Sequence, residues 1–134
     1  MTDARVESVY DDRIGSRSFL AQAEVFLGDS DAVGLSAPSR SILLHSAAVS
    51  ACDAILQAAG QRVTPGDRAH ILRLETALDH LGGDTEELFE RLDASRARRN
   101  EASYAAEFVA IASLADAREA TAELLDLARA FVDT

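Results

Sequence analysis

The chain has 134 residues, of which 48% are hydrophobic, so it carries enough apolar side chains for one globular domain spanning residues 1–134. Its formal net charge of −10 argues against general, nonspecific nucleic-acid binding, because such binding depends on many lysine and arginine contacts with phosphate. The polar, acidic start "MTDARVESVYDD" differs from a secretory signal, and no apolar run reaches the roughly 20 residues that a membrane-spanning helix needs. We therefore expect a cytoplasmic protein, with residues 1–15 as a candidate flexible N-terminal segment.

Hydrophobic residues at steps of three and four predict helices along most of the chain. The first expected helix covers residues 16–27 and stops at Gly28. The second covers residues 39–59, begins after Pro38 and stops at Gly60. Its high alanine content predicts that a neighbouring helix approaches it closely.

Two capping patterns predict the starts of the next two helices. Thr64 is expected to be the N-cap of the third helix, with Pro65 at the first helical position and the glycines at positions 82 and 83 as its stop. Asp84 is expected to begin the fourth helix, with Glu87 at capping-box spacing. This fourth helix leads into a cluster of arginines.

The last part of the chain is expected to hold an extended connection and a final helix. Residues 107–113, "EFVAIAS", are rich in β-branched and aromatic side chains, and Ser113 is expected to cap a helix over residues 114–132. The side chains expected to face the core are Phe19, Leu20, Ala23, Phe26, Leu27, Ile42, Leu43, Ala47, Ala51, Ile55, Leu56, Ala59, Ile71, Leu74, Leu78, Leu81, Leu88, Leu92, Ala102, Ala117, Ala120, Leu124, Leu127, Ala128 and Phe131. Together the elements predict an all-α fold, an up-and-down bundle of four to five helices.

The cysteine and the histidines do not indicate a metal centre or a nucleophile. His45, His70 and His80 fall on two expected helices and lack the four-residue spacing of helical zinc ligands. Cys52 lies in an apolar run, where a buried and inert thiol is expected. No cofactor or metal is expected.

An arginine-rich stretch, "SRARRNEASY" at residues 95–104, is the main candidate for chemistry. On a regular helix, Arg96, Asn100 and Tyr104 form one stripe, flanked by Arg99 and Ser103. Such a set of hydrogen-bond donors suits a phosphate or a ribose, so Arg96, Arg99, Asn100 and Ser103 are the predicted phosphate or nucleic-acid ligands.

An alternative for the same arginines is purely structural. They could pair with the neighbouring acids Glu90, Asp93, Glu101 and Glu107 and keep the helix soluble. The spacing alone leaves both interpretations open.

The order of these segments resembles the HEPN superfamily, the higher-eukaryote and prokaryote nucleotide-binding domain. The resemblance runs from about residue 16 to residue 132 and is strongest for the small stand-alone prokaryotic members. It rests on the helix "AAVSACDAILQAAG" with Asp53, on the leucine-striped helix after it, and on Arg99 and Asn100 followed by an aromatic residue.

The resemblance implies a helical bundle that usually forms a homodimer. Active members are metal-independent endoribonucleases or toxins, in which an arginine, a polar residue and a later histidine act on the ribose 2′-hydroxyl and the neighbouring phosphate. Mapped onto this chain, the catalytic positions are Arg99, Asn100 and Tyr104. Tyrosine stands where the histidine is expected, and a phenol with a pKa near 10 is a poor general base at neutral pH.

Three functions follow as hypotheses. The first is a HEPN-like dimer that binds RNA or a nucleotide with weakened or absent catalysis. The second is an endoribonuclease acting in defence or as the toxin of a toxin–antitoxin pair, with a nucleotidyltransferase-like antitoxin as its partner protein. The third is a non-catalytic helical interaction scaffold.

Overall fold

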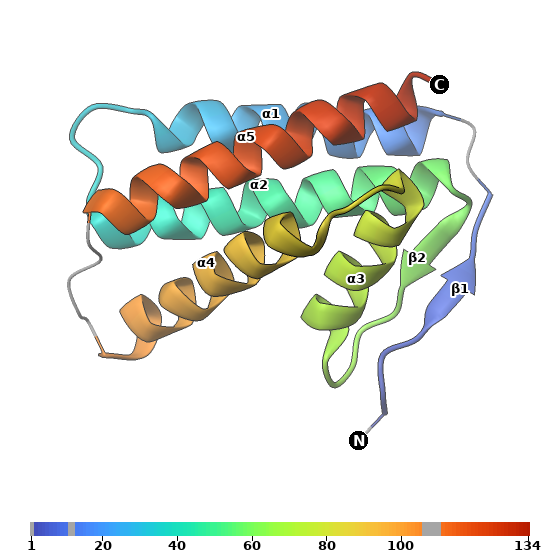
Figure 1. Ribbon diagram of the computed structural model, residues 1–134, viewed down its shortest axis with the longest axis horizontal. Helices are drawn as coiled ribbons and strands as arrows, with labels where there is room; N and C mark the ends of the chain where they lie inside the picture. Colours follow the sequence, from blue (N-terminus) through green and yellow to red (C-terminus); the bar gives the residue numbers. More distant parts are fainter. Residues whose placement is uncertain (1, 11–12, 106–110) are drawn as a thin grey trace.

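The computed structural model describes residues 2–10, 13–105 and 111–134, with the backbone alone for residues 96–105 and 111–112. The described residues form five helices and two short strands. The helices are α1 (Ile14–Ser30), α2 (Ala37–Ala58), α3 (Ala69–Leu81), α4 (Glu86–Ala105) and α5 (Ile111–Val132), and the strands are β1 (Val6–Ser8) and β2 (Gln61–Val63). The four long helices α1, α2, α4 and α5 run in alternating directions, and the shorter α3 crosses them (Figure 1). The predicted all-α, up-and-down bundle is confirmed.

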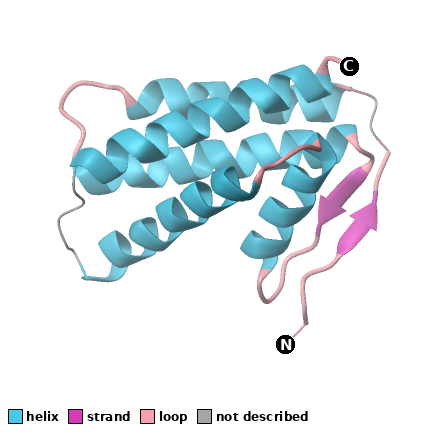
Figure 2. Cartoon of the chain, viewed as in Figure 1, coloured by secondary structure: helices cyan, strands magenta, loops and turns pink. Residues whose placement is uncertain are grey.

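The two strands are the part of the fold that the sequence did not indicate. β1 pairs with β2 in antiparallel register, with Val6 opposite Val63, at the end of the bundle beside α3 (Figure 2). The interpretation of residues 1–15 as a flexible segment is therefore wrong for β1. Each strand has three residues and includes one exposed or half-exposed charged side chain, which hides the alternating pattern of a longer strand.

The predicted start of the third helix is wrong. The Thr64 hydroxyl accepts a hydrogen bond from the backbone N–H of Arg5 at 2.9 Å, so it serves the strand pair instead of a helix N-terminus. α3 begins five residues later, after Gly66 and Arg68. Gly66 has φ = 150°, and a Cβ there would lie 2.5 Å from the carbonyl oxygen of Thr2, so only glycine allows the N-terminal segment to pass this close.

Helices α1 and α2 differ from their predicted bounds at the ends that face each other. α1 continues past Gly28 to Ser30, whose hydroxyl donates a hydrogen bond to the carbonyl of Leu27 at 2.6 Å. α2 begins with Ser36 as N-cap, and Pro38 sits in its first turn. A single glycine is tolerated on the exposed side of a helix, which explains why Gly28 does not stop α1.

The starts of α4 and α5 also differ from prediction. α4 begins at Glu86, two residues after Asp84, whose carboxylate accepts a hydrogen bond from the Glu86 N–H at 3.2 Å. α5 already includes residues 111–113, which were expected to be an extended connection with Ser113 as the cap. Residues 107–110 of that expected connection lie outside the described part of the chain.

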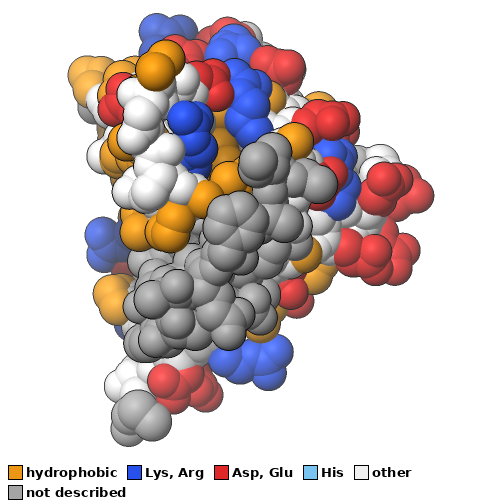
Figure 3. Space-filling view, turned by 90° about the vertical axis from the view of Figure 1, so that its left-hand side faces the viewer, with side chains coloured by type: hydrophobic (Ala, Val, Ile, Leu, Met, Phe, Trp, Pro, Cys, Tyr) orange, Lys and Arg blue, Asp and Glu red, His pale blue; other side chains and the backbone are white. Residues whose placement is uncertain are grey.

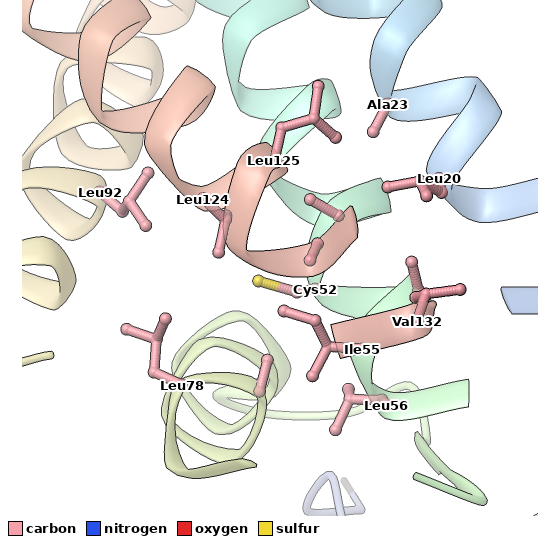
Figure 4. Packing of buried hydrophobic residues seen from close by; sticks show 14 of the residues in the cluster. Leu20, Ala23, Cys52, Ile55, Leu56, Leu78, Leu92, Leu124, Leu125 and Val132 are labelled. Atoms are coloured by element: carbon pink, nitrogen blue, oxygen red, sulfur yellow. The ribbon is translucent and has the colours of Figure 1, made fainter. Parts of the chain in front are cut away.

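The core is built around α2, which packs against α1, α3, α4 and α5. Ile55, Leu56 and Leu124 are among the largest fully buried side chains, and Figure 4 shows side chains from all five helices meeting there. Each such side chain contributes roughly 1.5–3 kcal/mol through burial. Two predicted core residues, Ile42 and Leu127, are instead exposed, and Leu125 is buried beside Leu124.

Among the described helices, α2 is also the one long and apolar enough to cross a membrane by length and composition alone. Half of its most apolar window is buried inside the bundle. The same composition is therefore explained by its central place in the core.

Candidate functional site

All five residues of the predicted anion-binding stripe lie on α4. The helix runs without a break to Ala105, so positions 96, 100 and 104 keep the four-residue helical spacing from which the stripe was predicted. The side chains of Arg96, Arg99, Asn100, Ser103 and Tyr104 lie outside the described residues. Whether they converge stays a prediction.

The last turn of α4 with described side chains leads toward this stripe. Leu92 and Ser95 are buried, and Asp93 is partly buried. Leu92 and Asp93 line a pocket that α4 forms with α2 and α3. Positions 96 and 97 follow Asp93 by one helical turn, so the arginine-rich stretch starts directly beside this pocket.

Both polar and apolar side chains line the pocket. Its polar residues are His45 from α2, His70 and Arg73 from α3, and Asp93 from α4. Its apolar residues are Ala48, Val49, Cys52, Leu74 and Leu92. The cavity volume is about 40 Å³, enough for a few water molecules or a group of similar size and too small for a nucleobase.

An ion pair between α2 and α3 supports one wall of the pocket. Arg73 Nε lies 3.0 Å from Asp53 Oδ1, and only about a quarter of each side chain is exposed. Burial raises the pKa of the Asp53 carboxyl above its ordinary value, and the neighbouring Arg73 guanidinium opposes that rise. Through this ion pair, Asp53 holds α3 against α2.

Cys52 is a buried thiol in the core cluster. It is 2% exposed, and burial raises the pKa of its thiol to about 12. A thiol with such a pKa holds almost no thiolate at neutral pH. The expectation that Cys52 is buried is confirmed.

Arg91, four residues before the arginine-rich stretch, is bound to α5. Its guanidinium donates to Asp116 Oδ1 from Nε at 3.0 Å and from Nη2 at 2.9 Å, and it lies 3.3 Å from Glu123 Oε2. The hydrogen bonds to Asp116 raise the pKa of Arg91. Arg91 therefore joins α4 to α5, and the structural alternative for the arginines of residues 95–104 stays a prediction.

His80 lies at the end of α3 and does not join the other two histidines at the pocket. Its Nε2 is 2.7 Å from the Gln61 side-chain oxygen, and its ring stacks obliquely near Phe131. Among the residues that the structure describes, no group of three or more histidine, cysteine, aspartate or glutamate side chains could hold a metal ion.

The sequence did not reveal that His45, His70 and Arg73 meet. These residues are 25 and 3 positions apart, on two helices, and no short motif links them. One signal was available: between Arg40 and Arg62, Asp53 is the single aspartate, glutamate, lysine or arginine, in the middle of the core helix. A charge in such a place requires a partner from another element, because an unpaired buried charge is costly.

Comparisons of the chain with protein-family models, with curated proteins and with solved structures give no match.

Proposed function

We propose that the protein is a HEPN-like homodimer that binds RNA or a nucleotide through α4 and the adjoining pocket. The observation that carries the proposal is the position of the pocket: it is lined by His45, His70, Arg73 and Asp93, and Asp93 lies one helical turn before the arginine-rich part of α4. Groups that can donate hydrogen bonds to phosphate or ribose thus begin at the pocket and continue along one helix.

The pocket itself offers little net positive charge, so we expect the arginines of α4 to attract the phosphate. Within the pocket, Arg73 is paired with Asp53, and Asp93 adds a further carboxylate. An anion is therefore attracted mainly by the arginines at positions 96, 98 and 99, while the pocket contributes imidazole hydrogen bonds and shape. The small cavity fits a phosphate oxygen better than a base.

Tyr104 is the reason that binding is proposed ahead of catalysis. A neutral phenol donates a hydrogen bond well and accepts a proton poorly at neutral pH. We therefore propose that Arg99, Asn100 and Tyr104 hold the ligand without cleaving it at a useful rate.

The test is the affinity for short single-stranded RNA of mixed sequence at about 50 mM salt, measured by fluorescence anisotropy. Arg99→Ala should weaken binding about 10-fold or more, because a charge-assisted hydrogen bond to phosphate is lost. Arg62→Ala is the matched control. It removes the same charge from an exposed position on β2, which lies at the end of the bundle away from the arginine-rich part of α4 (Figure 1). Unmeasurable binding of wild-type protein to RNA and to mononucleotides, or equal weakening by both variants, would contradict the proposal.

A second candidate is a metal-independent endoribonuclease of a toxin–antitoxin pair. It is favoured by one observation, the presence of His45 and His70 at the same pocket, because histidine is the side chain that most often serves as a general base and Tyr104 is a poor one. Induced expression of wild type should then slow growth and change the cellular RNA profile, and His45→Gln or His70→Gln should abolish both effects. Identical growth and RNA profiles for all three proteins would exclude this candidate.

A further inference from the structure

The outer side of α1 is an exposed surface without charge between Ile14 and Val25. α1 packs against α2 and α5, and its opposite side carries Ile14, Ser18, Ala21, Gln22 and Val25, all of them exposed. Ile14 is 70% and Val25 is 60% exposed, which is unusual for two large apolar side chains on the same side of one helix.

This surface has a charged border on the side of α5. Glu24 lies there and binds Arg129 of α5 at 2.9 Å, and Arg17 precedes Glu24 by two helical turns. On the side of α2 the border is polar and neutral: the Ser50 hydroxyl donates to the Gln22 side-chain oxygen at 3.4 Å. The uncharged surface therefore continues from α1 across its seam with α2.

A ridge and a hollow lie side by side on this surface. The hollow, about 450 Å³ in volume, is lined by Gly15, Ser18, Phe19 and Gln22. Val25 forms the ridge, seven residues after Ser18 and thus about 10 Å farther along the helix axis. Two copies of α1 placed antiparallel about a two-fold axis would each set Val25 against the hollow of the other copy, as an isologous contact requires.

The charge distribution favours a second copy at this surface over a contact elsewhere. Each chain carries a net charge of −10, so two copies repel each other wherever their carboxylates meet. Acidic side chains gather on other parts of the described surface, such as Glu75, Asp79, Asp84 and Glu86 between α3 and α4, and Asp116, Glu119 and Glu123 around Arg91. Figure 3, which faces one end of the bundle, shows red side chains along its right-hand edge and orange and white side chains together at its upper left.

The exposed area leaves room for such a contact. The chain exposes 7403 Å². A stable protein contact buries about 800 Å² on each partner. One contact of that size would cover roughly a tenth of the exposed surface.

We propose that two copies of the chain associate through the outer side of α1, antiparallel, with Val25 of each copy seated in the hollow formed by Gly15, Ser18, Phe19 and Gln22 of its partner. The inference rests on the proposed function for the dimeric state and adds the surface that forms it. Ser50 and Gln57, which lie against α1, and His45 and Cys52, which line the pocket, are on roughly opposite sides of α2, so this contact leaves the pocket uncovered.

The experiment is the molar mass in solution, measured by light scattering and by sedimentation over a range of concentrations. Wild-type protein should have twice the 14.3 kDa mass of one chain. Val25→Glu should raise the dissociation constant by about 100-fold or more, because the two-fold axis places a carboxylate in each hollow. Glutamate is a good helix former at an exposed helical position, so this variant should fold, and circular dichroism checks that it does.

Further variants make the test specific. Val33→Glu makes the same change at a fully exposed residue of the α1–α2 connection and should leave the dimer intact. Ser18→Glu and Val25→Arg should each weaken self-association. Mixing these two variants should restore a dimer, because the carboxylate introduced at position 18 of one copy would then contact the guanidinium introduced at position 25 of the other.

A monomeric wild-type protein at concentrations on the order of 100 μM would overturn the proposal, as would a Val25→Glu variant that dimerises like wild type. A mixture of Ser18→Glu and Val25→Arg that stays monomeric would overturn the antiparallel arrangement and the proposal with it. The RNA assay separates this inference from RNA binding: a dimer that binds no RNA contradicts the proposed RNA binding alone, and a monomer that binds RNA contradicts the dimer and leaves the RNA binding standing.

Discussion

Two arginine–aspartate pairs in this protein join the same two residue types, but the pKa of the aspartate is raised in one pair and lowered in the other. Arg73 and Asp53 join α3 to α2 with about a quarter of each side chain exposed, and the pKa of Asp53 is raised by burial. Arg118 and Asp31 join α5 to the α1–α2 connection with about half of each side chain exposed, and the hydrogen bond from Arg118 lowers the pKa of Asp31. Both carboxylates have an arginine partner, so the difference in their pKa shifts comes from the solvent exposure of the carboxylate.

Breaking the more buried pair should have the largest effect. Arg73→Ala leaves the Asp53 carboxylate in a partly dry site without its partner, and we expect it to lower the free energy of unfolding by about 1–3 kcal/mol at pH 7. Urea unfolding measures this change. A loss no greater than that of Arg118→Ala would show that the two pairs are energetically alike.

Replacing both members of the more buried pair should cost less than removing one. Asp53→Leu combined with Arg73→Met keeps most of the volume and removes both desolvation penalties, so its stability should lie within about 1 kcal/mol of wild type. The double-mutant cycle with the two single variants gives the coupling. A double variant as unstable as Arg73→Ala would mean that the pair itself, and not the uncompensated charge, stabilises the contact between α2 and α3.

The two carboxylates should give opposite pH dependences. Because the pKa of Asp53 is raised above 3.8, the folded state binds this proton more tightly, and stability falls as pH rises from about 4 through the folded-state pKa. Because the pKa of Asp31 is lowered, its stabilisation is present above about 4 and is lost as pH falls through the folded-state pKa. The stability of wild type relative to Asp53→Asn should therefore fall with pH, and relative to Asp31→Asn it should rise; slopes of the same sign would refute the comparison.

Removing the more exposed pair should have the smallest effect. Arg118→Ala should cost about 0–1 kcal/mol, since exposed ion pairs are solvated and screened. The cost should shrink further in about 1 M salt, where the Debye length is near 3 Å. Unfolding curves at low and high salt test this, and a loss that is large and independent of salt would place Arg118 among the buried contacts.

Much of the bundle followed from periodicity, because each long helix buries an apolar stripe that repeats every three to four residues. Leu20, Ala23, Leu124 and Ala128 were predicted to be buried and are. Ile42 was assigned to the core from the same spacing and is exposed, because spacing identifies a face and does not say how far the neighbouring helix covers it. The helix starts were less predictable, since Thr64 has a hydroxyl that suits a cap or a strand equally well.

The candidate site divides in the same way. The helix that carries Arg96, Asn100 and Tyr104 could be predicted from local sequence, and α4 runs through Ala105. The positions of these three side chains stay a prediction. The pocket beside α4 could not be predicted, because His45, His70 and Asp93 come from three helices whose relative placement depends on core packing.

Local information in the sequence, namely helical periodicity, composition and charge, determined that this chain forms a helical bundle with an acidic surface and an arginine-rich fourth helix. Only the tertiary structure decided which charged side chains are buried and which are exposed to solvent. It also decided that β1 pairs with β2 and that one side of α1 is left uncovered. The physical reason is that helix formation depends on neighbours within about four residues, whereas burial, pKa and surface exposure depend on atoms that folding brings in from distant parts of the chain.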